Sequence, residues 1–200
     1  MFIIAIVLSF IIGSLPFSFW IGKLIYGVDL RTMGSGNPGA TNLLRNVGRV
    51  PGIIGLILDT LKGGLPVIFL PPIFCPQEIN SLTLTDCSLF VGVSAILGHI
   101  FSPFLKFKGG KGVSTSLGVF LALVPKSMGL VLLISLPLIL LTRIMSFGVI
   151  IGTILFPVFT ILFYPEEGLL QITSILLALI IIIRHKNNIV RLIRGKELKL

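Results

Sequence analysis

Long apolar runs alternate with short polar segments along the chain, at 2–22, 50–72, 87–105, 112–125, 127–142, 146–164 and 168–183. A helix needs about 20 apolar residues, within a range of roughly 17–25, to cross the hydrocarbon core of a membrane. The first three runs and the sixth reach this length, and the others are shorter. The first run has no basic region before it, so we expect a retained helix and not a cleaved signal. The pattern predicts an all-α integral membrane protein with about seven transmembrane helices.

The fourth and fifth runs have a second interpretation, as a single helix broken at Pro125. Such a helix would leave the basic tail and Arg143 on the opposite face from the other basic loops. With seven spans, every Lys and Arg except Lys62 and Lys126 lies on one face, in loops 23–49 and 106–111, at Arg143 and in the tail 184–200. Because Lys and Arg are enriched in cytoplasmic loops, we prefer seven spans, with the N-terminus outside and the C-terminus in the cytoplasm.

The composition is typical of a protein that is embedded in a membrane. Of the 200 residues, 54% are hydrophobic and 12% are charged, and the mean hydropathy is +1.09. A soluble domain carries about 25% charged residues, so these charges are too few to cover a water-facing surface. The net charge of +9 would suggest nucleic acid in a soluble protein, whereas here it reflects the basic loops. We therefore expect a single membrane domain over 1–200, with lipid and not nucleic acid as its surroundings.

Two cysteines, Cys75 and Cys87, flank the polar loop 73–86. They can form a disulfide if this loop faces an oxidising compartment, or they can remain as two thiols. The sequence leaves both states open, and two cysteines alone do not make a metal site.

Asp59, Lys62 and His99 lie in or at the end of apolar runs. Asp59 and Lys62 are three residues apart and therefore share one face of a helix. Charges at membrane depth pair with each other or line a functional cavity, so an ion pair that fixes packing and a direct role in binding both remain open. His99 has no titratable partner near it in sequence, and we interpret it as a packing or hydrogen-bonding residue.

The first polar loop contains a glycine-rich segment over 34–42, with Arg45 one helical turn further along. Glycines permit left-handed backbone and close approach of a ligand, and backbone N–H groups before a helix bind anions. Arginine adds the two-pronged contact that phosphate prefers. A flexible connector is the alternative, but connectors seldom combine so many donors. The segment predicts an anion site, although it lacks the Gly-Lys-Ser/Thr ending of nucleotide phosphate loops.

The second polar loop, 106–111, leads into the fourth apolar run with the sequence Lys-Phe-Lys-Gly-Gly-Lys. We expect its glycines to place bare amides at a helix N-terminus, where the dipole favours an anion. Lysines can instead reach lipid headgroups, and we expect that role for Lys106 and Lys108. Lys111 lies between glycines and is the better candidate for a ligand contact.

The third polar segment begins at Arg184 and includes His185 and Asn188. If the segment is helical, these two polar side chains share a face. The alternative is an amphipathic basic tail on anionic lipid, which explains Arg194, Lys196 and Lys199 better than it explains the His and Asn.

The chain has no Ser-His-Asp pattern, no cluster of metal ligands and no paired carboxylates. We therefore expect no protein nucleophile, no metal and no cofactor. A transporter or channel for an organic phosphate or another anion is the rival class of function. No inverted repeat supports it, and the basic residues gather at one face instead of near the midplane.

Three segments together resemble the membrane-embedded bacterial acyl-phosphate:glycerol-3-phosphate acyltransferases, a family sometimes called PlsY. They are Gly34–Asn42 with Arg45, Lys108–Val113 and Arg184–Ile189. Asp59–Gly63 also resembles a recurring segment of that family. The resemblance extends over the whole chain and covers its length, number of spans and orientation.

The resemblance implies transfer of a fatty acyl group from acyl phosphate to the 1-hydroxyl of glycerol 3-phosphate, which gives lysophosphatidic acid and phosphate. It places the active site on the cytoplasmic side of the bacterial inner membrane. It implies that the amides around Ser35, Gly36 and Asn37 hold the acyl phosphate. It also implies that the acceptor is held by Ser35, Arg45, Lys111, His185 and Asn188. The full set of expected substrate-binding residues is Ser35, Gly36, Asn37, Gly39, Thr41, Asn42, Arg45, Gly109, Gly110, Lys111, His185 and Asn188, with no catalytic protein group.

Overall fold

The computed structural model describes residues 1–75 and 83–200, and the regular structure of these residues is helical. Residues 76–82, half of the predicted loop 73–86, lie outside the described residues. The α-helices are α1 (Phe2–Ser14), α2 (Phe17–Trp20), α3 (Ala40–Asn46), α4 (Arg49–Phe74), α5 (Leu84–Ile100), α6 (Val113–Leu123), α7 (Pro125–Thr142), α8 (Met145–Phe163), α9 (Gly168–Arg184) and α10 (Lys186–Ile193). A π-helix, η1 (Ile21–Ile25), continues α2, and two 3₁₀ turns are η2 (Leu30–Thr32) and η3 (Pro103–Leu105). The predicted all-α class is confirmed.

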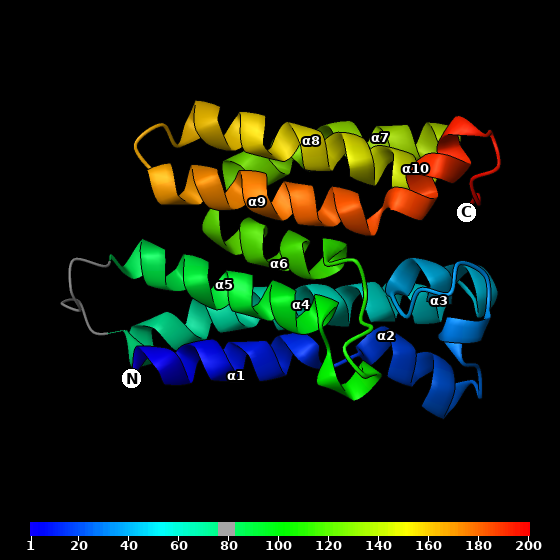
Figure 1. Cartoon of the computed structure of the whole chain (residues 1–200), viewed down its shortest axis with the longest axis horizontal. Coiled ribbons are helices and arrows are strands. Elements are labelled where there is room, and N and C mark those ends of the chain that lie inside the picture. The colour runs from blue at the N-terminus through cyan, green and yellow to red at the C-terminus, as the bar shows by residue number, and fades with distance from the viewer. Residues whose placement is uncertain (76–82) are drawn as a thin grey trace. The chain divides into compact units, whose positions relative to one another are not determined.

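The chain forms two compact units, Met1–Leu123 and Val124–Leu200. In the first unit, α4 is the central helix and packs against α1, α2, α3, α5 and α6, while α1 also packs along α5 (Figure 1). In the second unit, α8 packs between α7 and α9. The expectation of a single domain over 1–200 stays a prediction.

The predicted apolar runs all form helices, but they differ in their ability to span a membrane. Among the described residues, five segments are long and apolar enough: Phe2–Ile25, Arg49–Phe74, Leu84–Leu105, Pro125–Thr142 and Met145–Phe163. The pair α9 and α10, bent by 61°, makes a sixth if it counts as one span. Helix α6 has 11 residues and is therefore only about 16 Å long, roughly half of the hydrocarbon thickness. The protein is thus a multi-pass membrane protein with five or six candidate spans, and the orientation of its termini stays a prediction.

The first apolar run is not the single continuous helix that was expected over 2–22. Helix α1 ends at Ser14 and α2 begins at Phe17, with Pro16 between them. Proline has no N–H group to donate to the preceding turn, and its ring disfavours the helical conformation there. The proline therefore divides this run into two helices.

Small residues let the helices of the first unit approach closely. A side chain at Gly63 of α4 would overlap the backbone carbonyl of Thr115 in α6, and one at Gly118 would overlap the carbonyl of Thr60. A side chain at Gly13 of α1 would likewise overlap the backbone of Ala95 in α5. Contacts between small residues are a common basis of helix association in membranes.

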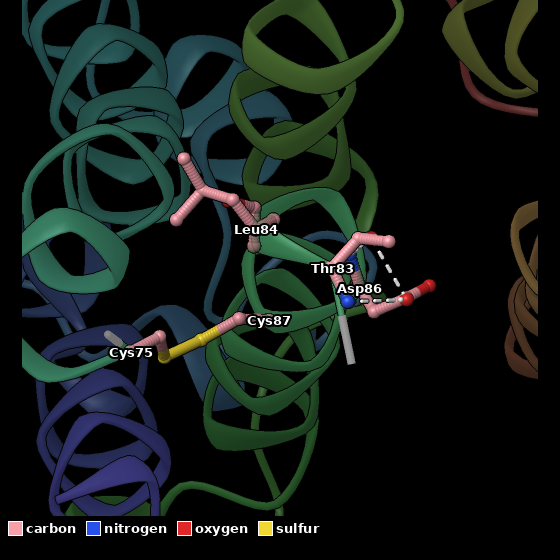
Figure 2. The surroundings of a disulfide bond; sticks show 6 residues. Cys75, Thr83, Leu84, Asp86 and Cys87 are labelled. Carbon is pink, nitrogen blue, oxygen red and sulfur yellow. Dashed lines mark hydrogen bonds between the residues drawn. A yellow bond between two sulfur atoms is a disulfide. The ribbon is translucent and has the colours of Figure 1, made fainter. Parts of the chain in front are cut away.

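A disulfide between Cys75 and Cys87 joins the end of α4 to the first turn of α5, with a Cα–Cα distance of 6.6 Å (Figure 2). Beside it, Thr83 and Asp86 form a reciprocal cap at the start of α5. The Asp86 amide donates to the Thr83 hydroxyl over 3.1 Å, and the Thr83 amide donates to the Asp86 carboxylate over 2.9 Å. Of the two states that the sequence left open, the structure has the disulfide.

Candidate functional site

The first glycine-rich segment forms a compact loop between η2 and α3. Gly34 and Gly36 have φ angles of 54° and 70°, which an L side chain adopts only with strain. The Gly36 amide donates to the Met33 carbonyl over 2.9 Å, and the Gly39 amide donates to the Asn37 side chain over 3.0 Å. The glycines therefore serve the left-handed turns that the sequence predicted.

Asn42 holds this loop from within, and only 1% of its surface is exposed. Its Nδ2 donates to the carbonyls of Leu30 and Met33 over 2.8 and 3.0 Å. Its Oδ1 accepts from the Ser35 amide and from Asn46 Nδ2, over 3.0 and 2.9 Å. Since both N–H groups of Asn42 are used inside the chain, we interpret it as a residue that shapes the loop.

The remaining polar residues of the segment are more accessible. Ser35, Asn37, Thr41 and Arg45 are each partly exposed, and Gly36 is exposed. Thr41 and Arg45 lie four residues apart on α3, and therefore on one face of that helix. The Ser35 amide is tied to Asn42 in the same helix. The structure therefore brings Ser35 to the helix that carries Thr41 and Arg45.

A small apolar core supports the loop and α3. Ile21, Leu30 and Leu43 are buried together, and the half-buried side chains packed on them are Val28, Val47 and Leu58. These residues come from η1, the loop, α3 and α4. The position of the Ser35 loop therefore depends on the segment that leaves α2.

Two other basic residues near this loop, Lys23 and Arg31, form ion pairs with Asp29. The guanidinium of Arg31 donates to both carboxylate oxygens, over 2.9 and 2.6 Å, and Lys23 Nζ lies 3.5 Å away. The hydrogen bonds from the Arg31 side chain and backbone hold the pKa of the Asp29 carboxyl well below its usual range. Arg31 also stacks over the Phe19 ring, 4.9 Å from its centroid. The Arg31 guanidinium is therefore already engaged by a carboxylate and an aromatic ring.

The second glycine segment uses its glycines in a way that the sequence did not predict. The Gly109 amide donates to the Ile100 carbonyl and the Gly110 amide to the His99 carbonyl, each over 3.1 Å. A side chain at Gly109 would overlap the His99 carbonyl, and one at Gly110 would overlap the His99 imidazole. The expectation of bare amides is therefore wrong for these two residues, because the loop folds back onto the end of α5.

The lysines of this segment differ in exposure. Lys106 and Lys108 are exposed, whereas Lys111 is partly buried. Lys106 and the neighbouring Phe107 have φ angles of 52° and 60°, unusual for residues other than glycine. The Phe107 amide donates to the carbonyl of Ser102 over 2.8 Å. In Figure 1 α3 lies toward the end of the first unit that is opposite the N-terminus.

His185 lies at the bend between α9 and α10, so the two helices are not continuous there. It is 3% exposed, and its Nδ1 lies 2.8 Å from the Ile181 carbonyl. A carbonyl only accepts, so Nδ1 carries the proton and Nε2 of the neutral ring is an acceptor. The structure therefore fixes the tautomer of this histidine.

Asn188 contacts a carboxylate that the sequence did not single out. Asn188 Nδ2 donates to Glu197 Oε1 over 2.8 Å, and Arg191 Nε donates to Oε2 over 2.8 Å. Burial raises the pKa of Glu197, and the hydrogen bonds from Arg191 and Asn188 lower it. The lowering is the larger effect, so the pKa lies below its ordinary value. Gly195, with φ 65°, turns the chain back toward α10. The chain reversal that brings Glu197 back onto α10 produces no periodic pattern of apolar residues. Gly195 is the only residue in the sequence that indicates it.

The arrangement in the first unit suits an anion. On and beside α3, Arg45 carries a positive charge and Ser35 and Thr41 carry hydroxyl groups, while Lys111 is a partly buried cation of the second loop. Phosphate oxygens accept hydrogen bonds from donors of both kinds.

Comparison with known proteins covers nearly the whole chain. Residues 3–195 match the family model described as glycerol-3-phosphate acyltransferase. The glycerol-3-phosphate acyltransferase of Trichlorobacter lovleyi is 44% identical over 191 residues, which are 96% of this chain and 93% of that protein. The corresponding protein of Fusobacterium nucleatum is 42% identical over 194 residues, with 97% and 95% covered.

Two solved structures of PlsY, an integral membrane glycerol 3-phosphate acyltransferase, are similar throughout. The glycerol 3-phosphate form is 37% identical with a TM-score of 0.86, and 100% of this chain and 95% of that chain are covered. The lysophosphatidic acid form is 36% identical with a TM-score of 0.83 and the same coverage. The resemblance inferred from the three motifs is confirmed, and the chain belongs to the glycerol-3-phosphate acyltransferase family.

Proposed function

We propose that this protein transfers a fatty acyl group from acyl phosphate to the 1-hydroxyl of glycerol 3-phosphate. The products are lysophosphatidic acid and inorganic phosphate. The observation that supports the acceptor best is the likeness, over the full chain, to a PlsY structure in its glycerol 3-phosphate form. The donor is inferred from the motifs, and it agrees with a membrane protein that needs an activated, lipid-soluble acyl group.

In the first unit, the loop that contains Ser35, Gly36 and Asn37 would receive the phosphate of the donor. Arg45 and Lys111 would supply positive charge to bound phosphate, since each is a cation close to a glycine-rich turn. Gly109 and Gly110 would act indirectly, by allowing the second loop to fold against His99. Thr41 would contribute its hydroxyl, and Asn42 would keep the loop in shape.

In the second unit, His185 and Asn188 would bind the acceptor. The protonated Nδ1 of His185 leaves Nε2 as an acceptor for a substrate hydroxyl, provided that the ring is neutral. Asn188 is oriented by Glu197 through a bond of 2.8 Å.

The reaction needs no protein nucleophile, because acyl phosphate is already activated. The 1-hydroxyl oxygen of the acceptor attacks the acyl carbonyl carbon, and the bond from this carbon to the phosphate oxygen breaks. The proton of the hydroxyl passes to the phosphate of the donor, whose second pKa of about 6 makes it a base at neutral pH. The protein aligns the substrates and stabilises developing charge.

We place the active site on the cytoplasmic side of the bacterial inner membrane. The basic loops support this placement through the positive-inside rule. Glycerol 3-phosphate is small and water-soluble, so a cytoplasmic site gives it direct access, while the acyl chain of the donor stays in the membrane.

The test is turnover by the purified protein in detergent. Palmitoyl phosphate and glycerol 3-phosphate are supplied, and lysophosphatidic acid and phosphate are followed, with palmitoyl-CoA as donor in a parallel reaction. Product from acyl phosphate alone is expected. Product from the CoA ester alone would keep the acyl transfer and overturn the donor.

The absence of product from either donor, with protein shown to be folded, would favour transport of an organic phosphate. A flux measurement in proteoliposomes would then replace the turnover assay. Turnover in detergent separates the two functions, because a transporter needs two compartments and an acyltransferase does not.

A further inference from the structure

The two residues of the buried ion pair Asp59–Lys62 in α4 also form hydrogen bonds to residues outside this helix. Lys62 Nζ lies 2.8 Å from Asp59 Oδ1, and these side chains are 1% and 2% exposed. Lys62 also donates to the Leu15 carbonyl over 2.6 Å, and Ser18 Oγ donates to Asp59 Oδ2 over 2.5 Å. The sequence had left open whether these charges pair or act in binding.

The two charges hold opposite sides of the break between α1 and α2. Leu15 precedes Pro16 and Ser18 follows it, so Lys62 holds the chain before the proline and Asp59 holds it after. Such a break leaves carbonyl groups without their helical partners. Lys62 supplies one replacement, and the Ser102 hydroxyl supplies another by donating to the Ser14 carbonyl over 2.6 Å.

A series of contacts connects α2 to the Ser35 loop. Helix α2 continues as η1, whose Ile21 packs with Leu30 and Leu43 in the core below the loop. The Leu30 carbonyl accepts from Asn42, and Asn42 accepts from the Ser35 amide. A continuous chain of contacts therefore runs from the ion pair to Ser35.

We infer that Asp59 and Lys62 are positioning residues, which set the Ser35 loop by fixing the angle between α1 and α2. A pair with only a packing role would need no bonds to both sides of Pro16. A pair that bound substrate directly would not have its donors and acceptors directed to Leu15 and Ser18. The functional part of this inference rests on the proposed role of the Ser35 loop in substrate binding.

The test compares Ser18→Ala with Ser9→Ala. Ser18 and Ser9 are both buried, at 1% and 0% exposure. Each hydroxyl makes one hydrogen bond to another helix, since Ser9 Oγ donates to the Val91 carbonyl over 2.6 Å. Ser9 lies on α1 away from the break, so Ser9→Ala is the matched control for loss of one buried bond.

Two readouts separate positioning from stability. Trp20, the single tryptophan of the chain, lies in α2 with its ring centroid 5.7 Å from that of Phe104, so its fluorescence reports the position of α2 without any substrate. The second readout is KM for glycerol 3-phosphate, measured together with kcat and the thermal midpoint. Lys62→Arg and Lys62→Met add a conservative and a disruptive change at the other charge.

We expect Ser18→Ala to shift the Trp20 emission and to raise KM about threefold to tenfold, the change that loss of one hydrogen bond produces. The kcat should change less, and Ser9→Ala should alter neither readout even where it lowers the thermal midpoint. Lys62→Arg should retain more of the normal KM than Lys62→Met.

Equal Trp20 emission and equal KM in Ser18→Ala and Ser9→Ala would overturn the inference. A shifted emission with an unchanged KM would overturn it as well, because α2 would then move without affecting the loop. A wild-type protein without acyltransferase activity would refute the proposed function instead, and the Trp20 comparison would still decide whether the pair fixes α2.

Discussion

At the scale of single residues, the side chains of Asn42 and Glu197 organise two polar segments of the chain from inside. Asn42 makes four hydrogen bonds to the first loop and to α3. Glu197 accepts hydrogen bonds from Asn188 and Arg191 and so holds the tail against α10. Residue type alone did not distinguish these roles from ligand contact, because an asparagine suits both.

Asn42→Ala should lower stability and weaken binding together. The substitution removes the donor to the buried Leu30 carbonyl, at a cost of about 1–3 kcal/mol for an unsatisfied buried group, while the Met33 carbonyl keeps the Gly36 amide. We expect a lower thermal midpoint and a higher KM for glycerol 3-phosphate. Asn187→Ala, at an exposed position in α10, is the control and should change neither quantity.

His185→Ala distinguishes binding from base catalysis. If the donor phosphate takes the proton, the substitution should raise KM while kcat stays near normal, as determined from steady-state rates over a range of pH. A loss confined to kcat, together with loss of one limb of the pH profile, would instead identify His185 as the base.

At the scale of elements, the positions of the helices were predictable and their interruptions were only partly so. Apolar runs of about 20 residues have few alternatives to helix in a membrane, which explains why the runs from 50–72 to 168–183 were confirmed as helices. The break at Pro16 was visible as a proline but was not predicted. The hydrogen bonds of Gly109 and Gly110 to the end of α5 form because the loop folds back onto that helix. No periodic pattern of apolar residues indicates such a fold-back.

Gly110→Ala should disturb the second loop, because the added methyl group would overlap the His99 imidazole. We expect a clear rise in KM for glycerol 3-phosphate and a lower thermal midpoint. Gly129→Ala is the control, since nothing lies within 4 Å of a side chain there. In the interior of α7 that change should stabilise the protein by up to about 1 kcal/mol.

The tail beyond α10 should lose its anchorage in acid. Because the pKa of Glu197 is lower in the folded protein than its ordinary value of 4.5, ionised Glu197 stabilises the fold at higher pH. This stabilisation is lost as the pH falls below about 4.5 and through the folded pKa. The protection of the residue 195–200 amides, measured relative to their intrinsic exchange rate at each pH, should therefore fall over this range, and Glu197→Gln should show low protection already at neutral pH.

At the scale of the whole molecule, charge asymmetry predicted an orientation that helix geometry alone does not reveal. The family and the multi-pass character are established, while the cytoplasmic placement of the basic loops remains a prediction. Helix α6 was the misleading element. Its composition is as apolar as that of a transmembrane helix, but with 11 residues it is too short to span the membrane.

Cysteines introduced at exposed positions test the orientation. Lys108→Cys should react with a membrane-impermeant thiol reagent only after the cells are opened. Glu166→Cys, in the turn between α8 and α9, should react in intact cells. The opposite pattern would reverse the proposed topology, and the wild-type protein supplies the background because its cysteines are paired.

The disulfide between α4 and α5 also bears on how the protein matures. Both cysteines of the chain are consumed by this bond, and such bonds form in oxidising compartments. A nascent chain whose second and third spans had not yet been delivered across the membrane would still carry two thiols. The thiol content of a purified sample therefore gives the fraction of molecules in which this bond has not formed.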